Sequence, residues 1–148
     1  MAFYEKTLLY LYPDFNRLTE AIDKKFTRYL AGAKTDTSPA IEQCQKLVAL
    51  TTAKIAIKDV EEILKETIEN FSPTEKIYLQ YKYFGKKDLL DETVFKSKSY
   101  FRRQKALADK VRYSLTRAGF TEERFNAELL PLTYVKEIHR RIELKEKC

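Results

Sequence analysis

Residues 38–71 read SPAIEQCQKLVALTTAKIAIKDVEEILKETIENF, with neither glycine nor proline after Pro39. Ser38 and Pro39 mark a helix start, because serine caps a first turn and proline is tolerated there without its N–H. Apolar residues then recur at mixed spacings of three and four, as in a helix buried along one side. They are Ile41, Cys44, Leu47, Val48, Leu50, Ile55, Ile57, Val60, Ile63, Leu64, Ile68 and Phe71. The pattern predicts one long helix over residues 39–70, with Cys44 as a small core residue.

The preceding residues complete a helical hairpin. Residues 14–30 place their apolar side chains on one stripe, and Gly32 supplies a C-terminal stop. The short connection over 32–38 favours antiparallel pairing with the long helix. The apolar run 3–12 fits either a strand or a helix, and we favour a helix because no other segment could pair with it as a strand. Residues 1–70 are therefore predicted to form a hairpin used for packing or dimerisation.

Residues 71–119 form a second predicted unit of three helices. Ser72, Pro73 and Glu75 combine an N-cap, a proline in the first turn and an acidic residue at the helix N-terminus, so a helix begins at 73 and ends at Gly85. A short helix within 88–95 and a long one from about 98 to Gly119 follow. Residues 120–148 add a helix capped by Thr121 and a charged tail, which either extends the basic surface or serves self-association. The predicted class is all-α: an N-terminal long-helix hairpin, a helix-turn-helix unit and a C-terminal helical tail.

Composition excludes several classes of protein. The 148 residues include only 3 glycines and 4 prolines, which argues against glycine-rich nucleotide-binding folds and against sandwiches and barrels. The single histidine and the two cysteines lie far apart, so we expect no metal, no cofactor and no disulfide framework. His139 is expected on the surface of a polar tail, and no catalytic constellation is visible, so we expect no enzyme. No apolar run is long enough to span a membrane, and we expect a cytoplasmic protein.

The positive charge is concentrated in one segment. The chain has 28 basic and 22 acidic residues, a formal charge of +6, and residues 96–117 contain eight basic residues against one acidic residue, Asp109. On a helical projection the basic residues lie opposite an apolar arc of Tyr100, Phe101, Leu107, Ala108, Val111, Leu115 and Ala118. Such a one-sign face repels itself, so we expect an anionic partner. Nucleic acid is favoured, with an anionic membrane surface and an acidic protein as the alternatives.

The start of this helix carries the candidate DNA contacts. Its serines can cap the helix or donate to phosphate, and its arginines can bind guanine bidentately or contact phosphate alone. Tyr100 has two open roles, a DNA contact or a core residue. The expected DNA-binding residues are Lys96, Ser97, Lys98, Ser99, Tyr100, Arg102, Arg103, Lys105, Lys110 and Arg112.

Residues 71–115 contain motifs of a known family. Ser72-Pro73-Thr74-Glu75, Tyr83-Phe84 and the segment SKSYFRRQKAL at 97–107 resemble the helix-turn-helix of region four in bacterial sigma factors and in phage late-transcription activators of the ArpU type. This resemblance implies that seven residues contact the DNA major groove or its flanking phosphates, namely Ser97, Lys98, Ser99, Tyr100, Arg102, Arg103 and Lys105.

Two hypotheses about function remain open. The first is a transcriptional regulator of phage or mobile-element type that binds double-stranded DNA, with RNA polymerase and a second copy of the chain as open further partners. The second is a non-enzymatic helical interaction or assembly protein, whose basic helix meets RNA polymerase or a phage packaging component. The salt dependence of binding separates them, because contacts to phosphates weaken steeply with ionic strength.

Overall fold

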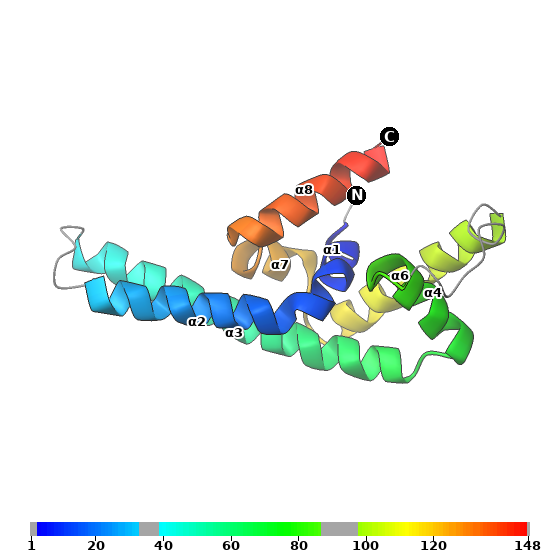
Figure 1. The fold of residues 1–148 in the computed structure, drawn as a ribbon, viewed down its shortest axis with the longest axis horizontal. Coiled ribbons are helices and arrows are strands. Elements are labelled where there is room, and N and C mark those ends of the chain that lie inside the picture. Colours follow the sequence, from blue (N-terminus) through cyan, green and yellow to red (C-terminus); the bar gives the residue numbers. More distant parts are fainter. Residues whose placement is uncertain (1–2, 33–38, 87–97, 148) are drawn as a thin grey trace.

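The computed structural model describes residues 3–32, 39–86 and 98–147, and it gives Lys98 and Lys147 as backbone only. Every element within these residues is helical, which confirms the predicted all-α class (Figure 1). In chain order the elements are α1 (Tyr4–Leu11), the 3-10 turn η1 (Tyr12–Asp14), α2 (Phe15–Gly32), α3 (Ala40–Glu69), α4 (Pro73–Tyr83), α6 (Lys98–Arg117), α7 (Glu122–Glu128) and α8 (Thr133–Lys147).

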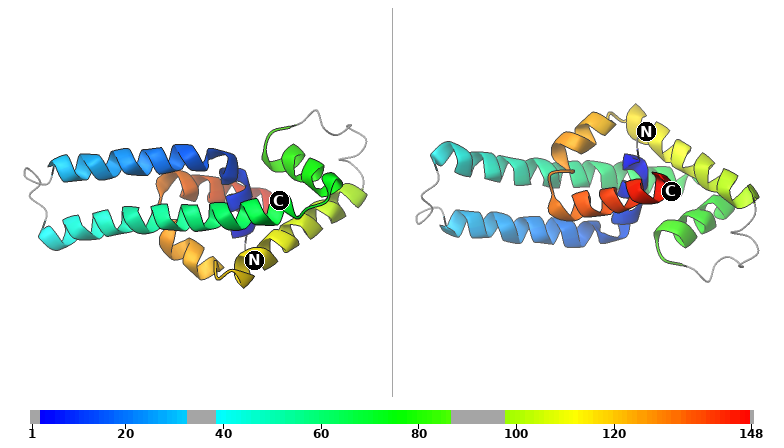
Figure 2. Two further views of the ribbon diagram at one scale, coloured as in Figure 1. Left: turned by 90° about the horizontal axis from the view of Figure 1, so that it is seen from below. Right: turned by 90° about the horizontal axis from the view of Figure 1, so that it is seen from above.

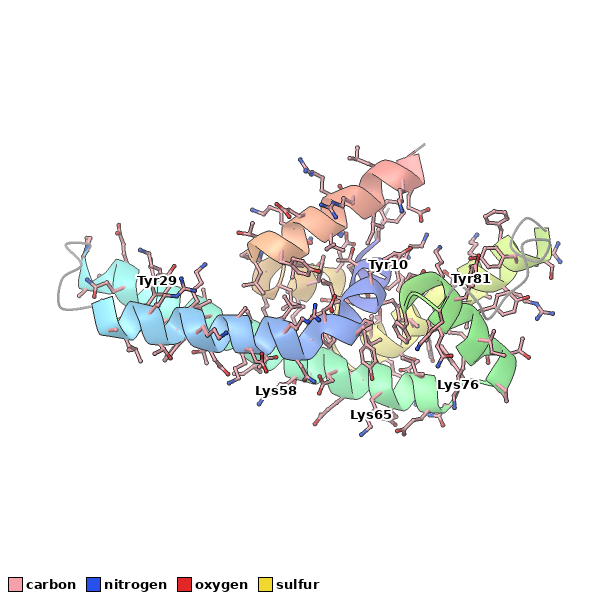
Figure 3. The ribbon with its side chains drawn as sticks, in the orientation of Figure 1. Tyr10, Tyr29, Lys58, Lys65, Lys76 and Tyr81 are labelled. Carbon is pink, nitrogen blue, oxygen red and sulfur yellow. The ribbon has the colours of Figure 1, made fainter. Side chains whose placement is uncertain are left out.

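Helices α2 and α3 form the predicted antiparallel hairpin, and they run side by side in both views of Figure 2. An ion pair of 2.7 Å joins Lys54 Nζ on α3 to Asp23 Oδ1 on α2. Towards the free end of the hairpin, the ammonium groups of Lys25 and Lys46 lie 5.8 and 5.6 Å from the centre of the Tyr29 ring (Figure 3). The buried residues of α3 begin only at Leu50, so the free end of the hairpin extends beyond the core.

Helix α1 lies at the centre of the molecule, between α6 and α8. Its buried leucines, Leu8 and Leu9, are 0% exposed. Thr7 Oγ1 lies 2.8 Å from His139 Nδ1, and Lys6 Nζ forms a 2.7 Å ion pair with Glu146 on α8. The apolar run near the N-terminus is therefore a helix, as favoured above, and its partners lie far away in the sequence.

All three predicted segments contribute to one hydrophobic core. Val60 on α3, Leu115 on α6 and Phe125 on α7 are fully buried in the same cluster of side chains. The Phe125 ring lies 6.0 Å from the ring of Tyr4 and 5.2 Å from that of His139. The hairpin, the basic helix and the C-terminal helices are consequently held together by shared packing.

Two glycines end helices in the way the sequence predicts. Gly85 after α4 and Gly119 after α6 have φ angles of 73° and 90°, in the left-handed region that glycine adopts at little cost. Beyond Gly119, the amide of Phe120 donates to the carbonyl of Leu115 at 2.8 Å. This reversal fixes the direction in which the chain leaves α6.

The prediction that Cys44 is a core residue is wrong, because its side chain is exposed. Ile41, Val48 and Ile55 from the same apolar pattern are also exposed, at 72%, 63% and 52%. Helix α3 in fact has two apolar faces, and the other helices that the structure describes cover only one of them. Helical periodicity identifies an apolar face, but the sequence does not show whether a second element packs on it.

Candidate nucleic-acid interface

Helix α6 is fixed to the rest of the fold by one apolar face. Leu107, Val111 and Leu115 are 0–2% exposed and belong to the central core. Near the start of the helix, the side-chain amide of Gln104 donates a 2.9 Å hydrogen bond to the backbone carbonyl of Tyr78 on α4. These contacts hold the orientation of α6, so its opposite face is presented to solvent in a constant direction.

Helix α4 supports α6 through a capping box at its own N-terminus. The hydroxyl of Ser72 accepts a 3.1 Å hydrogen bond from the amide of Glu75, while Oε1 of Glu75 accepts a 3.0 Å bond from the amide of Ser72. The second oxygen, Oε2, lies 2.6 Å from Nζ of Lys110 on α6. The hydrogen bonds from Lys110 and from the Ser72 backbone lower the pKa of the Glu75 carboxyl. One carboxylate therefore closes the first turn of α4 and ties that helix to α6.

The solvent side of α6 has a basic face. We define this face as Arg102, Arg103, Lys105, Lys110, Arg112 and Arg117, all of which are exposed. Asp109 is the only acidic residue within α6. Lys110 is paired with Glu75, and the guanidinium of Arg103 lies 5.4 Å from the centre of the Tyr78 ring. Among the described residues, no ion pair occupies any of the other four cations of the basic face.

Most of the predicted DNA contacts fall on this face or near it. Ser99 is exposed in the first turn of α6, close to Arg102 and Arg103. Lys96 and Ser97 lie outside the described residues, and Lys98 is described by its backbone alone. The N-terminal half of α6 lies beside α4, at the end of the molecule opposite the free end of the hairpin (Figure 1). The face is therefore not covered by α7 or α8 at this end.

Tyr100 does not belong to the basic face, and this corrects its place among the expected DNA contacts. Its side chain is 8% exposed and lies between α4 and α6, with its ring 5.8 Å from Tyr78 and 6.0 Å from Tyr81. The sequence left open whether Tyr100 contacts DNA or packs in the core, and in the structure it packs in the core. The position on the helix explains this, because Tyr100 is one turn from the buried Gln104 and two turns from Leu107.

Two large aromatic side chains are exposed on α6, Phe101 at the border of the basic face and Tyr113 within it. Phe101 is 64% exposed, although the helical projection places it on the apolar arc. Among the described elements only α4 covers this end of α6, and α4 packs against the neighbouring Tyr100 instead. Tyr113, which the sequence analysis did not single out, is 66% exposed. Ala118, the last residue of the predicted arc, is exposed as well. The surface of α6 therefore combines charge with apolar rings.

Buried polar groups lie beneath the basic face. Glu5 on α1 is 4% exposed, and among the described residues neither its Oε2 nor the hydroxyl of Tyr83 has a hydrogen-bond partner. Burial raises the pKa of the Glu5 carboxyl, and the positive charge of Arg112 offsets this only in part. Burial also raises the pKa of Tyr83. A buried carboxyl group with a raised pKa thus lies close enough to Arg112 of the basic face to feel its charge.

The remaining candidate residue, His139, takes part in the packing of α8 on the rest of the fold. His139 was expected at the surface, but its side chain is only 13% exposed because α8 packs on α1 and on Phe125 of α7. In the part of the chain that the structure describes, no three His, Cys, Asp or Glu side chains come together as a metal site would require. None of the described helices is long and apolar enough to cross a membrane.

The predicted helix-turn-helix is described only in part. Helices α4 and α6 pack against each other at the predicted positions, whereas the short helix expected within 88–95 lies outside the described residues. No family model, curated protein or solved structure matches the chain. The resemblance to sigma region four therefore stays an expectation, and function has to be inferred from the charge and geometry of α6.

Proposed function

We propose that the protein binds double-stranded DNA through the basic face of α6, as a transcriptional regulator of phage or mobile-element type. The observation that carries this proposal is a rigid helix whose exposed cations outnumber its acids six to one. Arg102, Lys105 and Arg112 follow one another at spacings of three and seven, so they lie on one line along the helix. A helix with such a line can follow the phosphates beside a major groove while its first turn approaches the base edges.

The exposed aromatic rings support a second candidate function. Phe101 and Tyr113 are more than 60% exposed, the first beside the basic face and the second within it, and aromatic residues are enriched where proteins meet proteins. In this alternative, the same face of α6 binds an acidic protein surface such as one on RNA polymerase or on a phage packaging component. Within the DNA hypothesis, the same Phe101 ring is suited to contact a thymine methyl group.

Fluorescence anisotropy with a random-sequence duplex at several salt concentrations tests the proposal. The informative variant is Arg102→Ala with Lys105→Ala, since neither side chain has an ion-pair partner among the described residues. Its matched control, Lys24→Ala with Arg28→Ala, removes two exposed cations from α2 and changes the net charge equally. Each cation that contacts a phosphate contributes about 0.9 to the slope of log K against log salt, so the first variant should lose about 1.8 and the control much less.

Three results would count against DNA as the ligand. They are absence of binding at low salt, an equal loss in both double variants, or affinity that does not change with salt. The last result, together with tight binding to a protein partner, would favour the alternative function, because an interface with an apolar centre is less sensitive to ionic strength.

A further inference from the structure

The free half of α3 has an apolar stripe that no described helix covers. We define this exposed stripe as Ile41, Cys44, Val48, Thr51 and Ile55, and all five side chains are exposed. At about 100° per residue, Val48 is about 200° from the buried Leu50, so the exposed stripe lies on the opposite side of α3 from the core. Thr51 donates its hydroxyl to the carbonyl of Leu47 at 3.0 Å, which leaves its methyl group for the stripe.

The spacing of the exposed stripe is that of a coiled coil. Its residues follow at intervals of three, four, three and four, the repeat that keeps a seam facing a partner helix. The isoleucine, valine and isoleucine at 41, 48 and 55 take the a positions, where β-branched residues are typical of two-stranded coiled coils. Cys44 and Thr51 take the d positions. The next d position is Lys58, which points away from the molecule and ends the stripe (Figure 3).

The residues that flank the exposed stripe are compatible with a second copy of the same chain. Gln45, Leu47 and Thr52 are uncharged, so no like charges would face each other there. In a parallel pair, Lys54 of one chain would be placed near Asp59 of the other, and each of these charges is already balanced within its own chain, Lys54 by Asp23 and Asp59 by Arg124. A stripe that pairs with itself about a two-fold axis needs flanks of this kind, which do not repel each other.

We propose that the exposed stripe on α3 pairs two copies of this chain in a parallel, two-fold symmetric dimer. The parallel direction rests in part on the proposed function. The free end of the hairpin and the N-terminal end of α6 lie at opposite ends of the molecule (Figure 1). A two-fold axis along α3 therefore brings both α6 helices to the same end of the dimer, where one DNA duplex can contact both. An antiparallel pair would place them at opposite ends.

The length of the exposed stripe predicts a weak dimer. Residues 41–55 span about 21 Å of helix, less surface than the roughly 800 Å² per partner that stable interfaces bury. We expect dissociation in the micromolar range without DNA. Two copies held on one duplex would have a high effective concentration, so the same weak contact would make DNA binding cooperative.

Cys44 provides the test, because equivalent d positions face each other in a parallel pair and not in an antiparallel one. We would replace Cys148 with serine and oxidise the full-length protein mildly without DNA, measuring the disulfide-linked dimer on a non-reducing gel and the mass by sedimentation. The expected result is a concentration-dependent dimer that crosslinks through Cys44. In that background, Val48→Glu should lower the crosslinked fraction roughly tenfold or more, while Leu144→Glu on α8 should not change it.

Each other outcome overturns the proposal. A monomer at every concentration removes the dimer, and a dimer that does not crosslink through Cys44, or that persists in Val48→Glu, uses another surface or direction. Circular dichroism of the Val48→Glu variant checks that it is folded, as expected for a residue 63% exposed. Because DNA is absent from this experiment, its failure would be distinct from a failure of DNA binding, which the Arg102 and Lys105 variant measures.

Discussion

Substitution of Glu75 by glutamine should strengthen DNA binding by releasing a cation. In the native protein one carboxylate oxygen caps α4 and the other holds Lys110 at 2.6 Å. Glutamine keeps an oxygen for the amide of Ser72, so the capping box can persist. Its NH₂ group cannot accept a hydrogen bond from an ammonium group. The variant should therefore retain the helix start while adding Lys110 to the free cations of the basic face.

The size of the effect follows from counterion release. One additional phosphate contact steepens the slope of log K against log salt by about 0.9. Between 50 and 200 mM salt, the advantage of the variant over the parent should then shrink by about 3.5-fold. The cost in stability should stay below about 1 kcal/mol, since the ion pair lies at the surface and salt screens it. The low pKa of Glu75 means that its carboxylate stabilises the fold above its unfolded-state pKa, and this contribution is lost as the pH falls through the folded value.

Anisotropy titrations of the parent and Glu75→Gln with one random duplex would measure both slopes. Glu122→Gln is the matched control, because Glu122 also lies in the first turn of a helix but belongs to α7. The substitution Glu122→Gln raises the net charge by the same amount as Glu75→Gln, but at a site away from the basic face. If Glu75→Gln and Glu122→Gln give the same slope as the parent, Lys110 does not contact phosphate and the side of α6 that borders α4 lies outside the interface. A slope that becomes shallower would refute the reasoning altogether.

Three further predictions concern stability and are measured by urea or thermal unfolding. Phe125→Ala should lose about 3–5 kcal/mol and lower Tm by about 10 °C or more, whereas Phe125→Leu should lose far less; equal losses would mean that the ring is not packed as described. Glu5→Gln should stabilise the protein by about 1 kcal/mol at neutral pH. Because the pKa of Glu5 is raised in the folded protein, the native carboxylate destabilises the fold above its folded-state pKa. The stability gained by Glu5→Gln should therefore vanish as the pH falls and the native side chain becomes protonated. A gain in stability that is the same at every pH would contradict this reasoning. Arg124→Ala should cost about 1–2 kcal/mol because Arg124 joins Asp59 on α3 to α7, and an unchanged Tm would show that this ion pair contributes nothing.

Local signals in the sequence were sufficient to predict where most of the helices begin and end. The capping box at Ser72 and Glu75 and the cap at Thr121 mark helix starts, and both are present. Gly85 and Gly119 mark helix ends, and both adopt positive φ. Such signals act within a few residues, so they do not depend on how the helices are assembled.

The errors arose where burial depends on distant elements. Cys44 and Phe101 lie on apolar arcs that none of the described helices covers, whereas His139 lies in a polar segment that packs against α1 and α7. Tyr100 follows the same rule, since its burial depends on Tyr78 and Tyr81 of α4. One helix alone indicates which of its faces is apolar, and only the arrangement of the other helices determines which face is covered.

The position of α1 between α6 and α8 has a consequence for how the chain folds during synthesis. Thr7 and His139, which pair across these helices, are 132 residues apart. At about 5–20 residues per second, α1 is synthesised some 7–26 seconds before α8 is available to it. The α2–α3 hairpin needs only neighbouring residues and can form early, while α1 gains its packing in steps, first against α6 and only later against α8. The nascent chain therefore carries a short apolar helix that is covered only in part until α8 is made, and aggregation at this stage should be sensitive to substitutions in α1.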